Sequence, residues 1–179
     1  MPRRWDLICF DWGGTLMHDR GPADLPMANW PEVRRVDGAL EVLARLHAEG
    51  QRVCVATNAS ASNKVQVRKA LERGGLLRFV EDVYCRTDIG FYKGDPQFWS
   101  IVQYRAHVND LSRVAMIGDS LEQDVLAPLR CGLGLGVWFQ PSAVAGSAAS
   151  ADAMRDMPPL PERARRVHSL LDVLPLLSD

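Results

Sequence analysis

Short apolar runs recur along the chain, and segments with helical spacing of apolar residues separate them. Runs of this kind that end at polar residues or glycine are typical of buried strands in a parallel sheet. The predicted strands are residues 7–10, 53–56, 80–85 and 114–117, with a fifth inside 132–139 and a short closing strand at 166–168. Alternating strands and helices predict an α/β fold: a doubly wound, three-layer sandwich with a mostly parallel central sheet and right-handed crossovers.

The segments between these strands predict helices, because their apolar residues recur every three or four positions. The predicted helices are residues 37–48, 62–73, 96–106, 121–130 and 169–174, the last one halted by Pro175, with a loop at 86–94. Two segments are less regular. Residues 17–37 contain three prolines and predict a short surface excursion, and residues 141–161 are rich in Ala, Ser and Pro and predict a loop-rich segment with one short helix around 152–157. We therefore expect a single domain over residues 1–179.

Composition narrows the class of protein. The chain has 179 residues, 47% hydrophobic and 24% charged, with a formal net charge of −1. This size allows a real core, and the near-neutral charge provides no field that attracts nucleic acid. No apolar run is long enough for a signal peptide or a membrane span, so we expect a cytoplasmic protein without a membrane partner. The four cysteines lack the spacing of a zinc site and predict buried free thiols.

Polar residues with chemical potential follow the predicted strands. Asp11 directly follows the first strand and precedes Gly13, Gly14 and Thr15; Thr57 and Asn58 follow the second. Lys93 follows the third strand, and Asp119 and Asp124 follow the fourth. Each of these residues alone has an ordinary explanation as a helix cap, a turn residue or a solvated side chain. In a parallel sheet, however, the carboxyl ends of the strands share one edge, and ligands bind there. The set therefore predicts a common site.

This ordered set resembles the haloacid dehalogenase-like (HAD) hydrolase superfamily over most of the chain. The first motif is Asp11-Trp12-Gly13-Gly14-Thr15, the second is Thr57, the third is Lys93 and the fourth is Gly118-Asp119 with Asp124. The resemblance implies a HAD-like Rossmannoid domain and a Mg²⁺-dependent phosphatase, with Asp11 as nucleophile and an aspartyl-phosphate intermediate. It implies no substantial cap, because residues 17–37, which stand where a cap would be inserted, are too few to supply one.

The resemblance also assigns roles to individual residues. The catalytic residues are Asp11, Thr57 and Lys93, and the metal ligands are the carboxylates of Asp11 and Asp119, Asp124 through water, and the Gly13 carbonyl. Substrate binding is expected from Gly14, Thr15 and Asn58. Physical chemistry supports this grouping, since a carboxylate can attack a dianionic phosphoryl group only if a cation and an ammonium offset the repulsion.

Gly13 departs from the pattern of the resembling phosphatases, which carry there an aspartate that serves as general acid and base. General acid or base help is typically worth about 10²- to 10⁴-fold in rate. His18 is a candidate replacement, and Trp12 and Trp30 either line the mouth of the site or pack beside the sheet. An open site predicts a large substrate, or a partner subunit of a homo-oligomer that acts as a lid. The expected partner is a small-molecule or larger phosphorylated substrate. The alternatives are a catalytically weak phosphate-binding or regulatory protein and a metal-independent haloacid dehalogenase.

Overall fold

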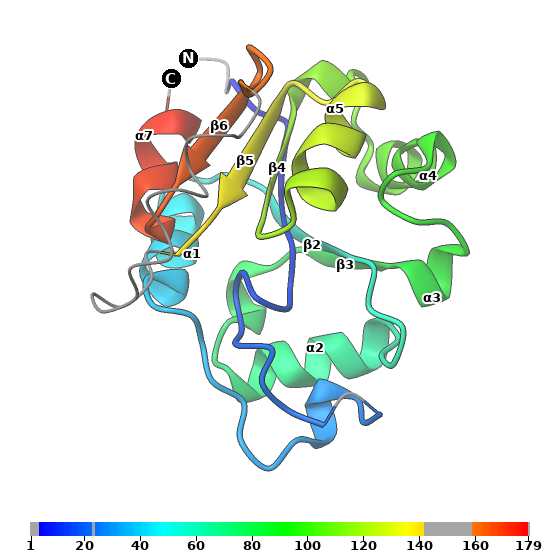
Figure 1. Ribbon diagram of the computed structural model, residues 1–179, viewed down its shortest axis with the longest axis vertical. Helices are drawn as coiled ribbons and strands as arrows, with labels where there is room; N and C mark the ends of the chain where they lie inside the picture. Colours follow the sequence, from blue (N-terminus) through cyan, green and yellow to red (C-terminus); the bar gives the residue numbers. More distant parts are fainter. Residues whose placement is uncertain (1–3, 23, 142–158, 179) are drawn as a thin grey trace.

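The computed structural model describes residues 4–22, 24–141 and 159–178, and a six-stranded sheet lies at its centre. The strand order is β3-β2-β1-β4-β5-β6, and all five pairings between neighbours are parallel. From β1 the chain builds outward to β3, then returns to the other side of β1 and builds outward to β6 (Figure 1). This confirms the predicted doubly wound fold. The strands are β1 (Leu7–Phe10), β2 (Val53–Thr57), β3 (Asp82–Cys85), β4 (Val114–Gly118), β5 (Leu135–Phe139) and β6 (Ala164–Val167).

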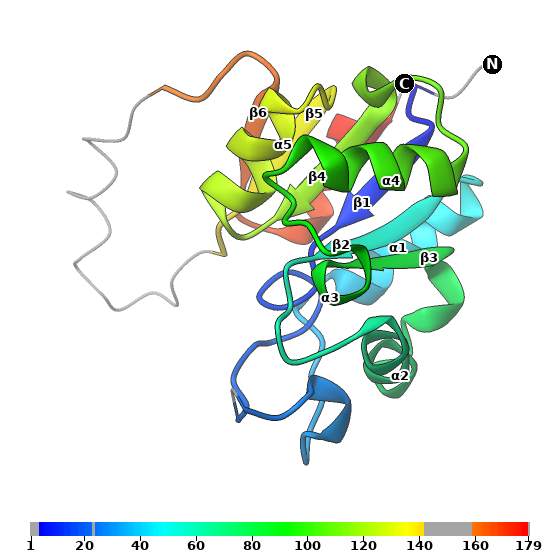
Figure 2. The same ribbon diagram turned by 90° about the vertical axis from the view of Figure 1, so that its right-hand side faces the viewer.

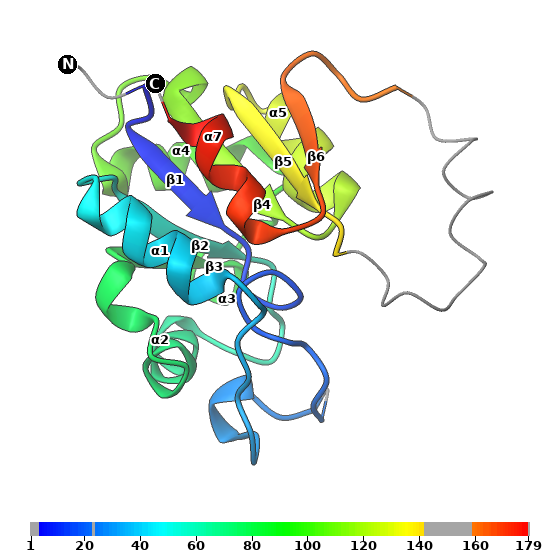
Figure 3. The same ribbon diagram turned by 90° about the vertical axis from the view of Figure 1, so that its left-hand side faces the viewer.

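Helices cover both faces of the sheet, because successive residues of each buried strand point to opposite sides. In β1, Ile8 and Phe10 belong to one apolar cluster, whereas Leu7 and Cys9 belong to another. Figure 2 shows α4 in front of the sheet, and Figure 3 shows α1 and α7 in front of the opposite face. The α-helices are α1 (Ala39–Ala48), α2 (Lys64–Arg73), α3 (Arg86–Ile89), α4 (Pro96–Ala106), α5 (Ala127–Arg130) and α7 (Leu174–Leu177).

Local signals set the helix ends. Asn63 caps α2, because its side chain accepts a hydrogen bond from the Gln66 amide while the Gln66 side chain accepts one from the Asn63 amide. The helix predicted from Ser62 therefore begins at Lys64. Pro96 occupies the first turn of α4, where its missing N–H costs nothing. Short 3₁₀ helices connect the longer elements: η1 (Met27–Asn29), η2 (Leu77–Phe79), η3 (Leu111–Arg113) and η5 (Leu170–Val173).

Several sequence predictions need correction. The third strand begins at Asp82 rather than Val80, because η2 occupies the preceding residues and Val80 caps it. The predicted loop at 86–94 contains α3, which Gly90 ends with a φ of 86°. The predicted helix 121–130 begins as a π-helical turn, η4 (Leu121–Leu126), before it continues as α5. Pro175 does not halt the last helix; it lies in the first turn of α7, where a proline fits.

The excursion at residues 17–37 is held against α2. It contains η1, and Met27 and Trp30 within it are buried. The Arg73 guanidinium of α2 donates hydrogen bonds to the backbone oxygens of Ala28, Trp30 and Pro31. The prediction that this excursion replaces a cap stays a prediction. Of the segment 141–161, the structure describes only residue 141 and residues 159–161, so the short helix expected around 152–157 lies outside the described residues.

Two compositional expectations also meet the structure. The four cysteines are free thiols, three of them buried. Within the described part of the chain, every helix is too short or too polar to cross a bilayer.

Candidate active site

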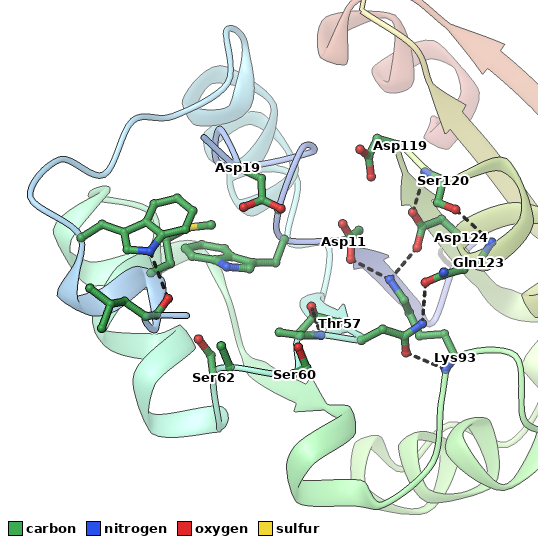
Figure 4. Close-up of a pocket in the computed structure, with 18 residues that line it drawn as sticks. Asp11, Asp19, Thr57, Ser60, Ser62, Lys93, Asp119, Ser120, Gln123 and Asp124 are labelled. Atoms are coloured by element: carbon green, nitrogen blue, oxygen red, sulfur yellow. Dashed lines mark hydrogen bonds and ion pairs between the residues drawn. The ribbon is translucent and has the colours of Figure 1, made fainter. Parts of the chain in front are cut away.

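The carboxyl ends of β1, β2 and β4 open into one cleft of about 360 Å³. Five residues that follow or end successive strands in the sequence all line it: Asp11, Thr57, Lys93, Asp119 and Asp124 (Figure 4). Residues as far apart in the chain as Asp11 and Asp124 therefore meet at one edge of the sheet. The lining residues that bear on the chemistry are Asp11, Gly13, Asp19, Thr57, Asn58, Lys93, Asp119, Ser120, Gln123 and Asp124.

A buried ammonium group lies between two carboxylates in this cleft. The Lys93 Nζ atom is 2.6 Å from Oδ1 of Asp11 and 2.5 Å from Oδ1 of Asp124. The Lys93 side chain is only 2% exposed. An ammonium group with this little access to water depends on partners of opposite charge, because solvent no longer stabilises it. Lys93 thus joins the end of β1 to η4 through one cation.

The backbone of Lys93 is held in place from two sides. The Asn58 side chain accepts a hydrogen bond from the Lys93 amide at 2.9 Å, and Trp99 of α4 donates its indole N–H to the Lys93 carbonyl at 2.7 Å. The Asn58 amide group also donates to Gln123 at 2.9 Å. Both ends of the Asn58 side chain are therefore engaged in positioning the site, and its predicted role in substrate binding stays a prediction.

Asp11, Asp119 and Asp124 offer carboxylate oxygens that lie within 4.8 Å of one another. Oxygen donors at this spacing fit a hard divalent cation such as Mg²⁺. Asp119 is the most exposed of the three. Asp124 uses both oxygens inside the protein, since Oδ1 contacts Lys93 and Oδ2 accepts the Ser120 amide at 2.9 Å. The donor set therefore fits two direct carboxylate ligands, with Asp124 placed to act through water.

Two glycines allow the acidic residues to pack this closely. Gly14 has a φ of +79°, and a Cβ atom there would lie 2.2 Å from Oδ2 of Asp119. A Cβ atom at Gly118 would lie 2.3 Å from the Asp124 carboxylate. A side chain at either position would therefore force the neighbouring carboxylate to move, and at Gly14 the positive φ would add backbone strain.

Burial and mutual charge shift the pKa values of the cluster. Burial raises the pKa of Asp11 to about 7, against the opposing effect of Lys93 and with a further contribution from Asp124. Burial lowers the pKa of Lys93, but the charges of Asp11 and Asp124 outweigh it and leave the pKa above its usual value. Partial burial and the charge of Asp124 raise the pKa of Asp119. Three acidic groups share one ammonium, so an added cation would relieve their repulsion.

The other predicted site residues lie at different depths. Thr57 is buried at the end of β2 and lines the cleft, and its hydroxyl accepts the Ala59 amide at 3.1 Å. Gly14 and Thr15 are absent from the lining. The Gly14 amide donates to the Met17 carbonyl, and the buried Thr15 hydroxyl makes no hydrogen bond among the described residues. Their substrate-binding role stays a prediction.

The cleft also contains residues that the sequence did not indicate. Asp19 comes from the excursion, Gln123 from η4, and Ser60 and Ser62 from the loop before α2. His18, the candidate replacement for the missing aspartate, does not line the cleft. Trp12 and Trp30 line the cleft and are also buried, at 3% and 6% exposed. Both belong to the apolar cluster that contains Ile8 and Phe10 of β1. No pattern in the sequence marked Asp19, which stands in an irregular segment rather than directly after a strand.

Comparisons with known proteins now place the chain. A family model described as haloacid dehalogenase-like hydrolase matches residues 32–132, a range that includes Thr57, Lys93, Asp119 and Asp124 but lies after Asp11. No curated protein matches the chain significantly.

Solved structures share the fold at low sequence identity. An uncharacterized protein from Listeria monocytogenes serotype 4b is 20% identical, with a TM-score of 0.76 over 96% of this chain and 97% of its own. A HAD family hydrolase from Deinococcus radiodurans R1, with bound phosphate and sodium, is 16% identical, with a TM-score of 0.65 over 96% and 94%. The putative HAD-hydrolase YfnB from Bacillus subtilis, bound to magnesium, is 22% identical, with a TM-score of 0.63. That match covers 84% of this chain but only 57% of YfnB.

Proposed function

The chain belongs to the haloacid dehalogenase-like hydrolase family, and we propose that it is a Mg²⁺-dependent phosphatase that forms a phosphoenzyme on Asp11. The observation that carries this proposal is the buried contact of Asp11 with Lys93 at 2.6 Å, beside two further carboxylates. The magnesium of the Bacillus relative and the phosphate of the Deinococcus relative support the proposal.

Asp11 is the nucleophile in this proposal because it is the acid fixed at the end of the central strand β1. Its amide donates to Ile117 of β4 at 2.8 Å, which fixes the backbone from which the side chain projects. Lys93 engages Oδ1, and among the described residues Oδ2 makes no hydrogen bond. Oδ2 is therefore the oxygen that attacks phosphorus, while the ammonium offsets the charge of the phosphoryl group.

The cation would be held by the Asp11 and Asp119 carboxylates, with Asp124 acting through water. A bound Mg²⁺ supplies positive charge that offsets the repulsion between the Asp11 carboxylate and a phosphoryl dianion. Thr57 lies at the cleft wall, where its hydroxyl is able to donate to a phosphoryl oxygen. The substrate is a phosphorylated small molecule or a larger phosphorylated molecule, encountered in the cytoplasm.

The test is turnover of an activated aryl phosphate by the purified protein, with Mg²⁺ and with a chelator. We expect release of the aryl alcohol with Mg²⁺ only, and loss of turnover in Asp11→Asn. Asp24→Asn is the matched control, because Asp24 is an exposed aspartate that does not line the cleft. Undiminished turnover in Asp11→Asn would sink the assignment of the nucleophile.

The same samples separate the alternatives. Phosphate binding without turnover of any phosphate ester would favour a binding or regulatory protein. Chloride release from a haloacid that persists with chelator would favour a dehalogenase, since that chemistry needs no metal.

A further inference from the structure

Hydrolysis of an ordinary phosphate ester requires a proton for the departing alcohol oxygen, and Gly13 has no side chain to supply one. The described residues that line the cleft include four carboxylates: Asp11, Asp19, Asp119 and Asp124. Asp11 and Asp124 are bound to Lys93. Asp119 lies in the group of carboxylates that fits a cation. Asp19 alone remains without an assigned part in the site.

The Asp19 carboxylate lies where a side chain at position 13 would project. A Cβ atom built on Gly13 would lie 3.2 Å from Oδ2, 3.4 Å from Cγ and 3.5 Å from Cβ of Asp19. The φ of Gly13 lies outside the left-handed region, so the backbone there does not itself demand glycine. The space beside Gly13 is therefore already filled by a carboxylate from six residues further along the chain. In Figure 4, Asp19 and Lys93 lie on opposite sides of Asp11.

The backbone that carries Asp19 is fixed by a tight network. The amides of Leu16 and Met17 both donate to the Trp12 carbonyl, and the Gly14 amide donates to the Met17 carbonyl. The His18 amide then donates to the Arg34 carbonyl at 2.9 Å. This network folds the chain after Asp11 back on itself and brings Asp19 to the cleft. Within the described residues, the Asp19 carboxylate has no hydrogen-bond or ion-pair partner, which leaves it available to a ligand.

We propose that Asp19 is the catalytic carboxyl group that serves the leaving group, in place of a side chain at position 13. This inference rests on the proposed phosphatase function. Asp11 forms a bond to phosphorus, the ester P–O bond breaks, and its electron pair stays on the alcohol oxygen, which takes the proton of the Asp19 carboxyl group. A water oxygen then bonds to phosphorus, the bond from phosphorus to Asp11 breaks with its electron pair returning to the Asp11 carboxylate, and a water proton passes to Asp19.

The first experiment compares Asp19→Asn with the wild type on an alkyl phosphate and on an activated aryl phosphate, with Mg²⁺. The measured quantity is kcat/KM, which includes the steps up to formation of the phosphoenzyme and excludes its hydrolysis. We expect kcat/KM to fall about 10²- to 10⁴-fold for the alkyl ester, because its alkoxide needs the proton. For the aryl ester, whose phenolate leaves unaided, we expect a change of less than about tenfold.

A second readout follows the phosphoenzyme directly. Asp19→Asn slows the attack of water, so the aryl ester should give a burst of one equivalent of phenol followed by a slow steady state. Asp24→Asn is again the control and should match the wild type in both readouts. Circular dichroism and a thermal melt establish that each variant is folded.

A swap variant tests position rather than mere presence of charge. Gly13→Asp combined with Asp19→Gly moves the carboxyl group to the other side of the same space. We expect the kcat/KM of this double variant on the alkyl ester to exceed that of Asp19→Asn by at least about tenfold. Equal kcat/KM for Asp19→Asn and wild type on the alkyl ester would overturn the assignment. Equal losses on both esters would also overturn it, because they would indicate a binding or structural role. Absence of wild-type turnover on both esters would overturn the phosphatase function and the role of Asp19 together.

Discussion

The cation shared by Asp11 and Asp124 offers a quantitative test of how the site is held together. Lys93→Met keeps a side chain of similar length but removes the ammonium that lies 2.6 Å and 2.5 Å from the two carboxylates. Removing one partner of a buried ion pair typically costs about 3–5 kcal/mol. Because Lys93 serves two carboxylates and Asp119 lies close by, we expect a loss in the free energy of unfolding near the top of that range, about 4–5 kcal/mol, at alkaline pH.

The loss should shrink as the pH falls. In the wild type burial already raises the pKa of Asp11 to about 7. Loss of the ammonium, which opposes this effect, should raise the pKa of Asp11 further above its value in the unfolded chain. A folded state with raised carboxyl pKa values binds more protons than the unfolded state, so its stability increases as the pH decreases through that window. The variant gains more than the wild type from this protonation. The gap between them should therefore narrow between about pH 8 and about pH 5.

Urea unfolding followed by circular dichroism, without divalent cations, measures both quantities. Mg²⁺ should then stabilise Lys93→Met more than the wild type, because it supplies a cation to carboxylates that have lost the ammonium. The control is Lys69→Met, which removes an exposed lysine of α2 and should change the free energy of unfolding by less than about 0.5 kcal/mol.

A loss of stability in Lys93→Met no larger than that in Lys69→Met at alkaline pH would refute the role of the ammonium. A gap to the wild type that stays constant with pH would also refute it, because the cost would then come from packing rather than from unpaired charge.

Three further predictions concern single positions. In the absence of metal, Asp11→Asn should be more stable than the wild type at about pH 8, because it removes a carboxylate whose pKa is raised to about 7. This advantage should be smaller at about pH 5, where the folded wild type has Asp11 protonated; urea unfolding at both pH values measures the difference. Gly14→Ala should lose about 1–3 kcal/mol and bind Mg²⁺ more weakly, because its Cβ atom would lie 2.2 Å from Asp119 at a φ of +79°. Gly13→Ala, whose nearest contact is at 3.2 Å, is the comparison. Asp119→Asn should weaken the rise in melting temperature caused by Mg²⁺, measured by titration in a thermal-shift assay.

The fold class was predictable because apolar patterning, and with it the alternation of strands and helices along the chain, is a local property of the sequence. Each predicted strand overlaps an observed one, and α4 has the predicted bounds. The errors lie where tertiary context sets the local structure. The π-helical turn of η4 coincides with the burial of Asp124 between Lys93 and the Ser120 amide, a requirement that helical spacing does not reveal. Pro175 has no local mark that distinguishes a helix start from a helix end.

The main residues of the site were predictable for a related reason. Asp11, Thr57 and Asp119 directly follow or end neighbouring parallel strands, so the sheet itself brings them to one edge. Lys93 reaches that edge from the loop before α4, and the sequence cannot show that Asn58 and Trp99 hold its backbone. These contacts join residues 35 and 6 positions apart and depend on the finished fold.

Asp19 shows why the composition of a site is harder to predict than its centre. A residue three positions after a strand end, such as Gly13, is placed by the strand, whereas a residue nine positions after it, such as Asp19, is placed by whatever folds the intervening loop. Here that is a set of backbone hydrogen bonds around Met17 and His18, and backbone groups leave no trace in residue identity. Gly13 therefore does not by itself indicate that the site lacks a fourth carboxylate, because the Asp19 carboxylate lies in the space that a side chain at position 13 would enter. Positions 13 and 19 must therefore be considered together, because the missing side chain at position 13 leaves the space that the Asp19 carboxylate fills.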